Sequence, residues 1–318
     1  MGLNRFQLVG GTLANVLTVN QTRNITLADN LPDDSGIHHI LAELQMRIAD
    51  RVDEPLFHSA VPLDGRTSVV RTRETNLGNI LADAVRAYYN TDIALINSGS
   101  LRCDRIIDAG VISVKDMIGV YHRPLPVHDA KTQLCGLPLL NAAADILPFD
   151  NPFVVKRLQG RTVAEALENA VCDIIDGRFF QVSGITFRVH RQAPVGSRVH
   201  AVHLAPGHTS GAPTSPTAAM VPLDGEGEYT VSMTAFIAEG FDGYTLFKGV
   251  PTLIDEEGGM TDSSLFLQVF RRNTHDVYGR EPGDRARAAI ILGKAPGGLP
   301  FVSPSVQGRI RYIRRGVS

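Results

Sequence analysis

The chain begins with a segment in which apolar and polar residues alternate, from Phe6 to Leu27. Alternation with a period of two is typical of β-strands, so this segment predicts one or two strands. Apolar residues then recur at near-helical spacing from Ile37 to Val52, behind a turn-forming Asp-Asp-Ser-Gly run, which predicts an amphipathic helix. We interpret residues 1–60 as a linker-like segment of strand and helix that precedes a larger domain, residues 61–318.

The larger domain opens with a helix followed by a strand. Apolar side chains from Leu77 to Tyr88 share one helical face, and Thr75 or Asn76 is the expected N-cap. The run Asp92–Asn97 that follows is short and almost wholly apolar, so it predicts a buried strand that ends in small polar residues. Strand ends of this kind are where α/β-type folds usually place ligands.

The rest of the domain mixes helices and strands without strict alternation. The hydrophobic pattern predicts helices over 162–175 and 262–270, strands over 178–190, 197–205 and 228–237, and a Gly- and Pro-rich linker over 293–305. This order favours an α+β fold, in which mixed sheets with flanking helices form a sandwich, over a doubly wound sheet.

Composition narrows the class of protein. The hydrophobic fraction of 43% and the charged fraction of 20% are typical of a soluble globular chain. A net charge of -2 lacks the basic footprint of a nucleic-acid-binding domain. No apolar run reaches the roughly 18 residues that span a bilayer, and the N-terminus has no signal-peptide pattern. We therefore expect no nucleic-acid or membrane partner and, by default, a cytoplasmic location.

The sequence lacks the motifs of several catalytic sites. Two-metal phosphoesterases need clustered Asp, His and Asn ligands, which occur as patterns such as Asp-x-His and Gly-His-x-His. Neither pattern occurs here, and neither does a phosphate-binding P-loop nor a Gly-x-Ser-x-Gly turn. His122, His128 and Cys135 are better explained as unrelated loop residues than as metal ligands. We expect no catalytic residue and no metal site in this chain.

The remaining polar candidates suit an anionic ligand. Arg73 and Arg102 each lie beside a short polar turn, and guanidinium groups bind phosphate in a bidentate manner. Asn97, at the end of a predicted strand, offers both a donor and an acceptor to a base or a ribose. Asp242 lies in a Gly-flanked turn, where its carboxylate is able to accept hydrogen bonds from ribose hydroxyls.

Two aromatic residues complete the set. Phe149 and Phe236 occupy loop-like positions, and two such rings can sandwich a nucleobase, with stacking of roughly 1–3 kcal/mol per base. The alternative is structural: the arginines pair with carboxylates and the phenylalanines belong to the core. Composition alone favours that alternative.

Seven short motifs in the chain resemble the C-terminal domain of 5′-nucleotidases, and they occur in the family's order. They are Arg73–Asn79, Asn97–Arg102, Leu147–Asn151, Gly177–Ile185, Pro194–Val199, Ala235–Tyr244 and Val306–Ile310. Each motif is weak alone, but together they cover most of residues 61–310. The family pairs a two-metal phosphoesterase domain with a C-terminal domain that recognises the nucleoside.

The resemblance implies a role for each candidate. It makes Arg73 and Arg102 the phosphate-side arginines, Asn97 the base or ribose contact, Phe149 and Phe236 the stacking pair, and Asp242 the ribose-binding carboxylate. It also implies that a nucleoside monophosphate or a nucleoside is the ligand. Divalent metals are then expected only in a separate metallophosphoesterase domain.

The chain departs from the family in three respects. It has no metal-binding domain, since Met1 falls where the family's linker segment begins. Phe241 stands where the family's turn has glycine, so we expect it to shift Asp242 or to narrow the pocket. Gly119–Ala144 interrupts a segment that is continuous in the family, either as a surface insertion or as translated intron sequence.

The leading hypothesis is a nucleotide-binding module from a nucleotide-catabolic phosphohydrolase that is inactive alone. One alternative is an active phosphohydrolase that is completed by a metal domain in trans. The other is a degenerate scaffold that binds no nucleotide.

Overall fold

The computed structural model describes residues 2–8, 19–26, 53–117, 146–173, 176–205, 220–271 and 280–313. The chain divides into two units, residues 1–50 with 123–142 and residues 51–122 with 143–318. In the first unit, β1 (Gly2–Leu8) pairs antiparallel with β2 (Val19–Thr26), which confirms the two predicted strands. The predicted helix over 37–52 and the segment Gly119–Ala144 lie outside the described residues.

The second unit is built around a mixed five-stranded sheet of order β14-β8-β13-β5-β9. Its strands are β5 (Ile93–Asn97), β8 (Phe153–Gln159), β9 (Phe180–Ser183), β13 (Glu228–Thr234) and β14 (Thr252–Ile254). β13 runs parallel to β5 and antiparallel to β8, whereas β5 pairs antiparallel with β9. Since β5 and β13 are parallel, their C-terminal ends lie at the same edge of the sheet.

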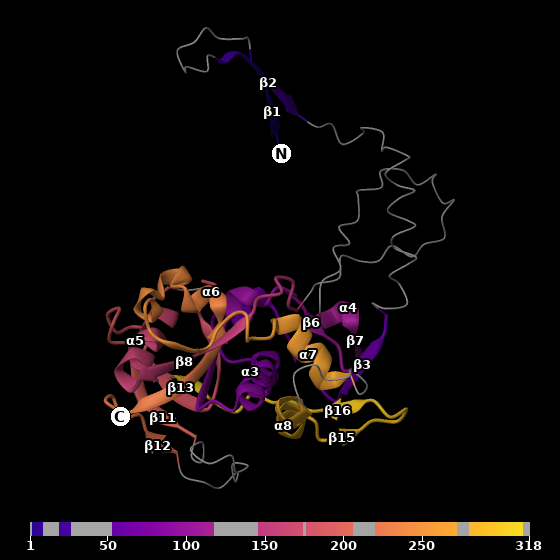
Figure 1. Cartoon of the computed structure of the whole chain (residues 1–318), viewed down its shortest axis with the longest axis vertical. Coiled ribbons are helices and arrows are strands. Elements are labelled where there is room, and N and C mark those ends of the chain that lie inside the picture. The colour runs from indigo at the N-terminus through magenta and orange to yellow at the C-terminus, as the bar shows by residue number, and fades with distance from the viewer. Residues whose placement is uncertain are drawn as a thin grey trace. The chain divides into compact units, whose positions relative to one another are not determined.

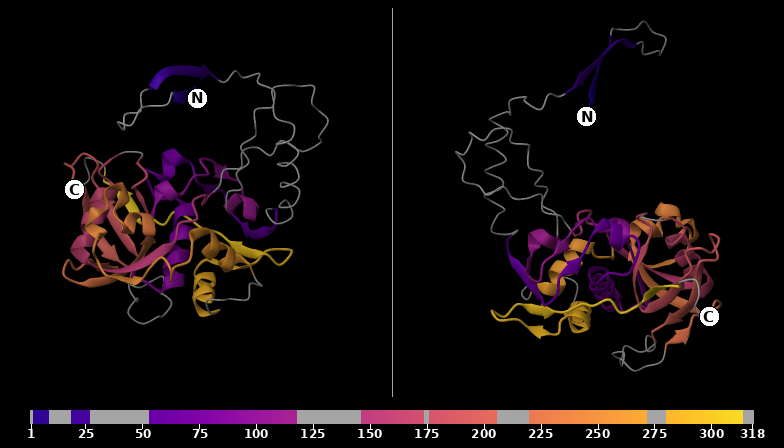
Figure 2. Two further views of the ribbon diagram at one scale, coloured as in Figure 1. Left: turned by 45° about the horizontal axis from the view of Figure 1, so that its top comes forward. Right: turned by 180° about the vertical axis from the view of Figure 1, so that it is seen from behind.

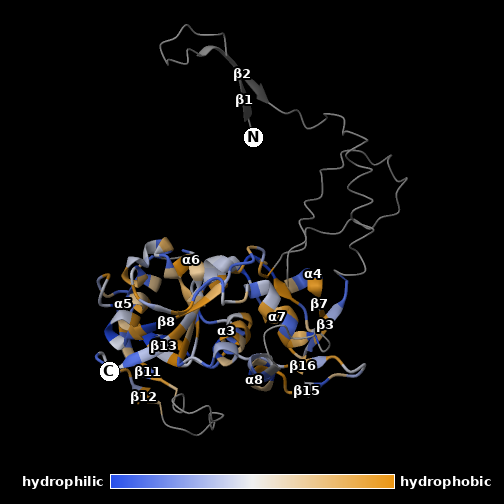
Figure 3. Cartoon of the chain, viewed as in Figure 1, coloured by the Kyte–Doolittle hydropathy of each residue, from blue (hydrophilic) through white to orange (hydrophobic). Residues whose placement is uncertain are grey.

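Both faces of this sheet are covered. In β5 all five residues are buried, and they alternate between two hydrophobic clusters. Ala94 and Ile96 pack with the helical side, whereas Ile93 and Leu95 pack with the opposite side. A strand that is buried on both faces reads as a continuous apolar run, as the sequence indicated. Figure 3 shows the apolar residues gathered between the helices and the strands.

Helices and smaller sheets form the flanking layers (Figures 1 and 2). The helices are α2 (Thr67–Val70), α3 (Asn76–Tyr89), α4 (Val114–Met117), α5 (Gly160–Ala170), α6 (Ala235–Ala238), α7 (Asp262–Phe270) and α8 (Arg280–Ile290), with the 3₁₀ turns η1 (Ser98–Ser100), η2 (Phe241–Gly243) and η3 (Thr245–Phe247). α3 packs against α7, α8 and the central sheet. α5 packs on the opposite face of the sheet, together with the apolar side chains of β10.

Three smaller sheets complete the unit. They have the orders β12-β11-β10-β17, β15-β16-β3-β7 and β4-β6. Their strands are β3 (Pro55–Ser59), β4 (Leu63–Asp64), β6 (Ile106–Ile107), β7 (Gly110–Ser113), β10 (Ile185–Val189), β11 (Val199–Leu204), β12 (Val221–Pro222), β15 (Gly293–Lys294), β16 (Pro300–Val302) and β17 (Ile310–Tyr312). The mixed sheets and flanking helices confirm the α+β fold class.

The cap of α3 shows how the local sequence produces this arrangement. The Thr75 side chain accepts a hydrogen bond from the Gly78 amide at 3.0 Å, which satisfies one of the unpaired N–H groups at the helix start. Asn90 follows the helix in the left-handed conformation, with a φ of 52°. The predicted linker over 293–305 is wrong in part, because it contains β15 and β16.

Candidate functional site

The site begins at the sheet edge where β5 and β13 end. Asn97, the last residue of β5, is only 4% exposed, and its Oδ1 accepts a hydrogen bond from Thr234 Oγ1 at 2.9 Å. Thr234 is the last residue of β13, so this bond joins the ends of two parallel strands. Phe236 follows two residues later in α6. The parallel pairing therefore brings Asn97 and Phe236 to one edge of the sheet.

Two glycines form the floor of the site. The Gly99 amide donates to the Gly177 carbonyl oxygen at 2.8 Å. A Cβ atom added to Gly177 would lie 3.1 Å from the Gly99 Cα atom and 3.6 Å from Asp242 Oδ2. A side chain at position 177 would therefore require the backbone at Gly99 to shift. The carboxylate of Asp242 therefore lies directly beside this paired backbone.

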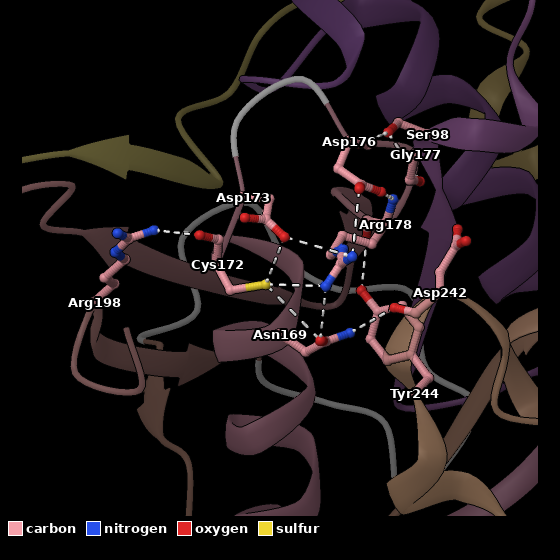
Figure 4. A network of polar contacts seen from close by, with 10 residues as sticks. All are labelled: Ser98, Asn169, Cys172, Asp173, Asp176, Gly177, Arg178, Arg198, Asp242 and Tyr244. Carbon is pink, nitrogen blue, oxygen red and sulfur yellow. Dashed lines mark hydrogen bonds and ion pairs between the residues drawn. The ribbon is translucent and has the colours of Figure 1, made fainter. Parts of the chain in front are cut away.

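The turn that carries Asp242 is held by backbone conformation and by two hydrogen bonds. Asp242 itself is left-handed, with a φ of 52°, between Gly240 at 94° and Gly243 at 81°. Asn169 Nδ2 donates to the Asp242 carbonyl oxygen at 3.0 Å, and the Tyr244 hydroxyl donates to the Arg178 carbonyl oxygen at 2.6 Å. Figure 4 shows the Asp242 carboxyl group pointing away from the Asn169 contact, towards the side that carries Gly177.

Among the described residues, the Asp242 carboxylate differs from the other carboxylates nearby in its lack of a protein partner. In the described part of the chain, no hydrogen bond or ion pair reaches its side-chain oxygens. Burial raises the pKa of Asp242, and the nearby negative charge of Asp176 raises it further. The charges of Arg178, Arg71 and Arg102 oppose this rise in the pKa. The carboxylate is thus a partly buried acceptor that has no partner among the described residues.

Arg71 is a site residue that the sequence analysis missed. It is the C-cap of α2 and is half-buried. Its Nε atom is buried without a hydrogen-bond partner, and among the described residues no ion pair reaches its guanidinium. Burial raises the pKa of Asp176, but the Arg178 hydrogen bonds outweigh it and lower the pKa, and the charge of Arg71 adds to the lowering. The charge of Arg71 also opposes the rise in the pKa of Asp242.

Arg102 lies on the rim of the same edge. Its Nε donates to the Gly99 carbonyl oxygen at 2.9 Å, and its backbone amide donates to the Ile146 carbonyl oxygen at 3.2 Å. The guanidinium carbon lies 5.1 Å from the centre of the Phe149 ring, a cation–π contact. The guanidinium keeps its terminal nitrogens exposed to solvent.

The aromatic candidates come from two connected segments. Phe149 is 47% exposed and Phe236 is 37% exposed, so neither ring belongs to the core. The Ala235 amide donates to the Pro152 carbonyl oxygen at 2.8 Å, which ties the segment that carries Phe149 to the start of α6. The structural alternative, in which both rings are core residues, is therefore wrong.

Arg73 does not join this group. It is exposed, and its charge contributes to lowering the pKa of Asp64, an effect that is led by the Arg66 hydrogen bond. It lies on the wall of a separate hollow of about 420 Å³. That hollow is lined by Asp64, Arg66, Val69, Arg73, Glu74, Thr75, Asn76 and Val306, whose formal charges cancel. A role for Arg73 in ligand binding stays a prediction.

Arg178 and Asp176 form a polar network that the sequence analysis also missed (Figure 4). Arg178 Nη1 lies 3.1 Å from Cys172 Sγ and 3.4 Å from Asn169 Oδ1, and its Nη2 lies 3.3 Å from Asp176 Oδ2. The Asp173 carboxylate forms an ion pair with the same nitrogen at 3.5 Å. These contacts occupy the guanidinium group of Arg178 within the chain. Arg178 therefore differs from Arg71 and Arg102, whose guanidinium groups form no ion pair among the described residues.

Phe241 corrects one expectation of the sequence analysis. The backbone of Phe241 is not left-handed, because the positive φ values fall on its neighbours Gly240, Asp242 and Gly243. Its position therefore does not need the conformational freedom of glycine. Its ring is 52% exposed and stacks on Phe236, with 4.8 Å between ring centres and 15° between ring planes.

In the described ranges, no group of three or more His, Cys, Asp or Glu side chains is arranged to hold a metal ion. None of the helices described is long and apolar enough to cross a membrane.

The geometry defines a candidate site at one edge of the central sheet of an α+β domain, and comparison with known proteins gives the family of the chain. The model of the family described as 5′-nucleotidase, C-terminal domain, matches residues 55–136 and 140–249. The chain therefore belongs to the 5′-nucleotidase C-terminal domain family.

Two curated relatives and one solved structure illustrate the likeness. The trifunctional nucleotide phosphoesterase protein YfkN of Bacillus subtilis is 26% identical over 279 residues, which cover 86% of this chain and 15% of that protein. Protein 5NUC of Lutzomyia longipalpis is 28% identical over 228 residues, which cover 70% of this chain and 37% of that protein. A crystal structure of a 5′-nucleotidase precursor from Thermus thermophilus is 25% identical, with a TM-score of 0.60, and the match covers 94% of this chain and 48% of that one. The chain thus spans less than half the length of these relatives.

Proposed function

We propose that this chain binds a nucleoside monophosphate or a nucleoside, and that it is the recognition domain of a phosphohydrolase of nucleotide catabolism. One observation carries the proposal: groups of complementary chemistry that have no internal partner gather at the edge where β5 and β13 end. Asp242 and Arg71 are unpaired there among the described residues. Two exposed rings, Phe149 and Phe236, come from segments joined at the same edge.

Each group suits one part of a nucleotide. The guanidinium groups of Arg71 and Arg102 match the charge of a monophosphate. The Asp242 carboxylate suits the two hydroxyls of a ribose, and the Asn97 amide suits a base or ribose atom. The Phe149 and Phe236 rings offer stacking surfaces for a base. Arg73 remains a candidate for the phosphate side, but Arg71 is the better placed of the two.

In this proposal the chain positions the nucleotide and does not cleave it. Hydrolysis by a two-metal mechanism needs cations that activate water and neutralise the phosphate. We assign those metals to a separate metallophosphoesterase domain, in a longer protein or in trans. The work of this chain is then to hold the base, ribose and phosphate in one orientation.

Calorimetric titration with AMP, in buffer without divalent metal, tests the proposal. We expect saturable binding, which weakens by about ten- to a hundredfold in Arg71→Ala and in Arg102→Ala, because each variant loses charge-assisted hydrogen bonds. Arg157→Ala is the matched control, since that exposed arginine lies on β8 and faces Glu228 at 3.9 Å.

Two outcomes would contradict the proposal. No heat and no thermal stabilisation at millimolar AMP would refute the binding function. Release of phosphate from AMP by the purified chain with added divalent metal would refute the assignment of catalysis to a separate domain.

A further inference from the structure

Phe236 and Phe241 form an exposed aromatic pair at the proposed base subsite. Their ring centres are 4.8 Å apart and their planes are 15° apart, so one ring covers a face of the other. Both side chains project to solvent, with 37% and 52% of their surface exposed. A stacked pair that remains exposed gains little from burial, so its position at a ligand-binding edge calls for a functional explanation.

The turn fixes the place of the Phe241 ring. Gly240 and Asp242 on either side are left-handed, and the Asp242 carbonyl oxygen is held by Asn169. The residue that carries the ring is therefore anchored by the same turn that presents the Asp242 carboxylate. Among the described residues, the Phe241 ring stacks on Phe236 alone, and more than half of its surface is open.

The other stacking surface is also occupied from within the chain. The guanidinium carbon of Arg102 lies 5.1 Å from the centre of the Phe149 ring. In the part of the chain that the structure describes, no ring contact joins Phe149 to Phe236 or Phe241. The Phe241 ring is thus not inserted between the two rings, but it covers one face of Phe236.

We propose that Phe241 is a specificity-determining residue of the base subsite, because its ring covers one face of Phe236, the ring that the proposed function assigns to base stacking. This inference rests on the proposed nucleotide-binding function. A ligand with a base binds only by displacing the Phe241 ring. A ligand without a base leaves the Phe236–Phe241 stack intact.

The expected effect follows from the strength of an aromatic stack. Removing the Phe241 ring, which competes with the base for a face of Phe236, should tighten the binding of AMP by about two- to tenfold, the factor that corresponds to one stacked aromatic pair. The same change should leave the affinity for ribose 5-phosphate unaltered, because that ligand contacts the sugar and phosphate groups but needs no ring.

The experiment compares the wild-type chain with Phe241→Ala by titration with AMP and with ribose 5-phosphate. Leu292→Ala is the control, since it truncates an exposed apolar side chain beside the C-terminal end of α8 and should alter neither affinity. Phe241→Leu is a second variant that keeps apolar bulk without a ring, and it should also tighten AMP binding. In a Phe236→Ala background, Phe241→Ala should not tighten AMP binding, because the Phe236 ring on which the base and Phe241 would both stack is absent.

The outcomes separate this inference from the function on which it rests. Unchanged or weaker binding of AMP by Phe241→Ala, with ribose 5-phosphate still bound, would overturn the role of Phe241 and leave the nucleotide-binding function standing. An equal gain for both ligands would also overturn it, because the effect would then not depend on the base. Failure of both proteins to bind either ligand would refute the proposed function and this inference together.

Discussion

Asp262 should make the stability of this domain depend on pH in an unusual direction. It is the first residue of α7 and is only 1% exposed. Its Oδ1 accepts a hydrogen bond from the Ser263 amide at 2.7 Å, but its Oδ2 is buried without a partner. Burial, together with the negative charge of Asp150, raises the pKa of Asp262 to about 7.

The sign of the effect follows from linkage. The folded pKa of about 7 lies above the ordinary aspartic acid value of 3.8, so the folded state holds this proton more tightly than the unfolded state does. The stabilising contribution of the Asp262 proton to the free energy of unfolding is fully present below about pH 4, and it is lost progressively as the pH rises towards 7. With about 1.4 kcal/mol for each pKa unit, the raised pKa of Asp262 lowers the free energy of unfolding by about 2 kcal/mol at pH 5 and by about 4 kcal/mol at pH 8, relative to its value below pH 4.

The test is the variant Asp262→Asn, which keeps the shape of the side chain but cannot ionise. Urea unfolding should be followed at pH 5 and at pH 8 for both proteins. The stability of the variant relative to wild type should be about 2–3 kcal/mol more favourable at pH 8 than at pH 5. Any constant penalty from the buried amide of asparagine cancels in this comparison.

A control of opposite sign sharpens the result. The Thr67 amide donates to the Asp104 carboxylate at 2.8 Å, and this bond lowers the pKa of Asp104. Asp104→Asn should therefore lose stability relative to wild type as the pH rises through the acid range. If the difference between Asp262→Asn and wild type were the same at both pH values, Asp262 would not be the buried acid described here.

Two further predictions concern the site. Gly177→Ala should destabilise the fold by about 1–3 kcal/mol, by overpacking, and should weaken AMP binding, because its Cβ would press on the Gly99 backbone beside Asp242. Gly225→Ala, where a Cβ would meet nothing within 4 Å, should change neither quantity in the same urea and titration assays. Asp242→Asn should stabilise the unliganded chain above about pH 4, since the pKa of Asp242 is raised by burial and by Asp176, yet it should weaken adenosine binding. A stable Asp242→Asn protein that bound adenosine normally would contradict the ribose-binding role.

The parts of the fold that the sequence predicts are those with a strong local signal. α3 combines an apolar face with a threonine cap, and β5 is a short apolar run, so each was recognisable from its own residues. α8 has a weak local signal, because its sequence, Arg-Glu-Pro-Gly-Asp-Arg, begins with polar and helix-breaking residues, and Ala286 and Ile290 are its only buried apolar side chains among the described residues. β15 and β16 were taken for a linker because the pairing of β16 with β3 joins residues far apart in the chain.

In the candidate site, too, residues with a local sequence signal were predictable, whereas residues whose role depends on distant contacts were not. Five of the six predicted residues, all except Arg73, lie at or beside the sheet edge where β5 and β13 end, and each of the five lies in or beside a turn or a strand end. Arg71 was missed because no local pattern distinguishes it from Arg73, two residues later. The two differ only in the folded chain, where the charge of Arg71 acts on Asp242 and that of Arg73 acts on Asp64. Asp176 gave no signal either, because its effect on the pKa of Asp242 depends on a contact across 66 residues.

The state of the polar groups at this edge favours a binding site over a degenerate scaffold. An unsatisfied polar group that is buried costs stability, and an unpaired charge costs more. The same domain satisfies comparable groups elsewhere: Arg309 pairs with Asp83 at 2.7 Å, and Arg178 contacts four neighbours. Arg71 and Asp242 are left unpaired although each lies near groups of opposite charge. A ligand with an anionic group and hydroxyls would satisfy both at once, which is the physical reason to expect a nucleotide between them.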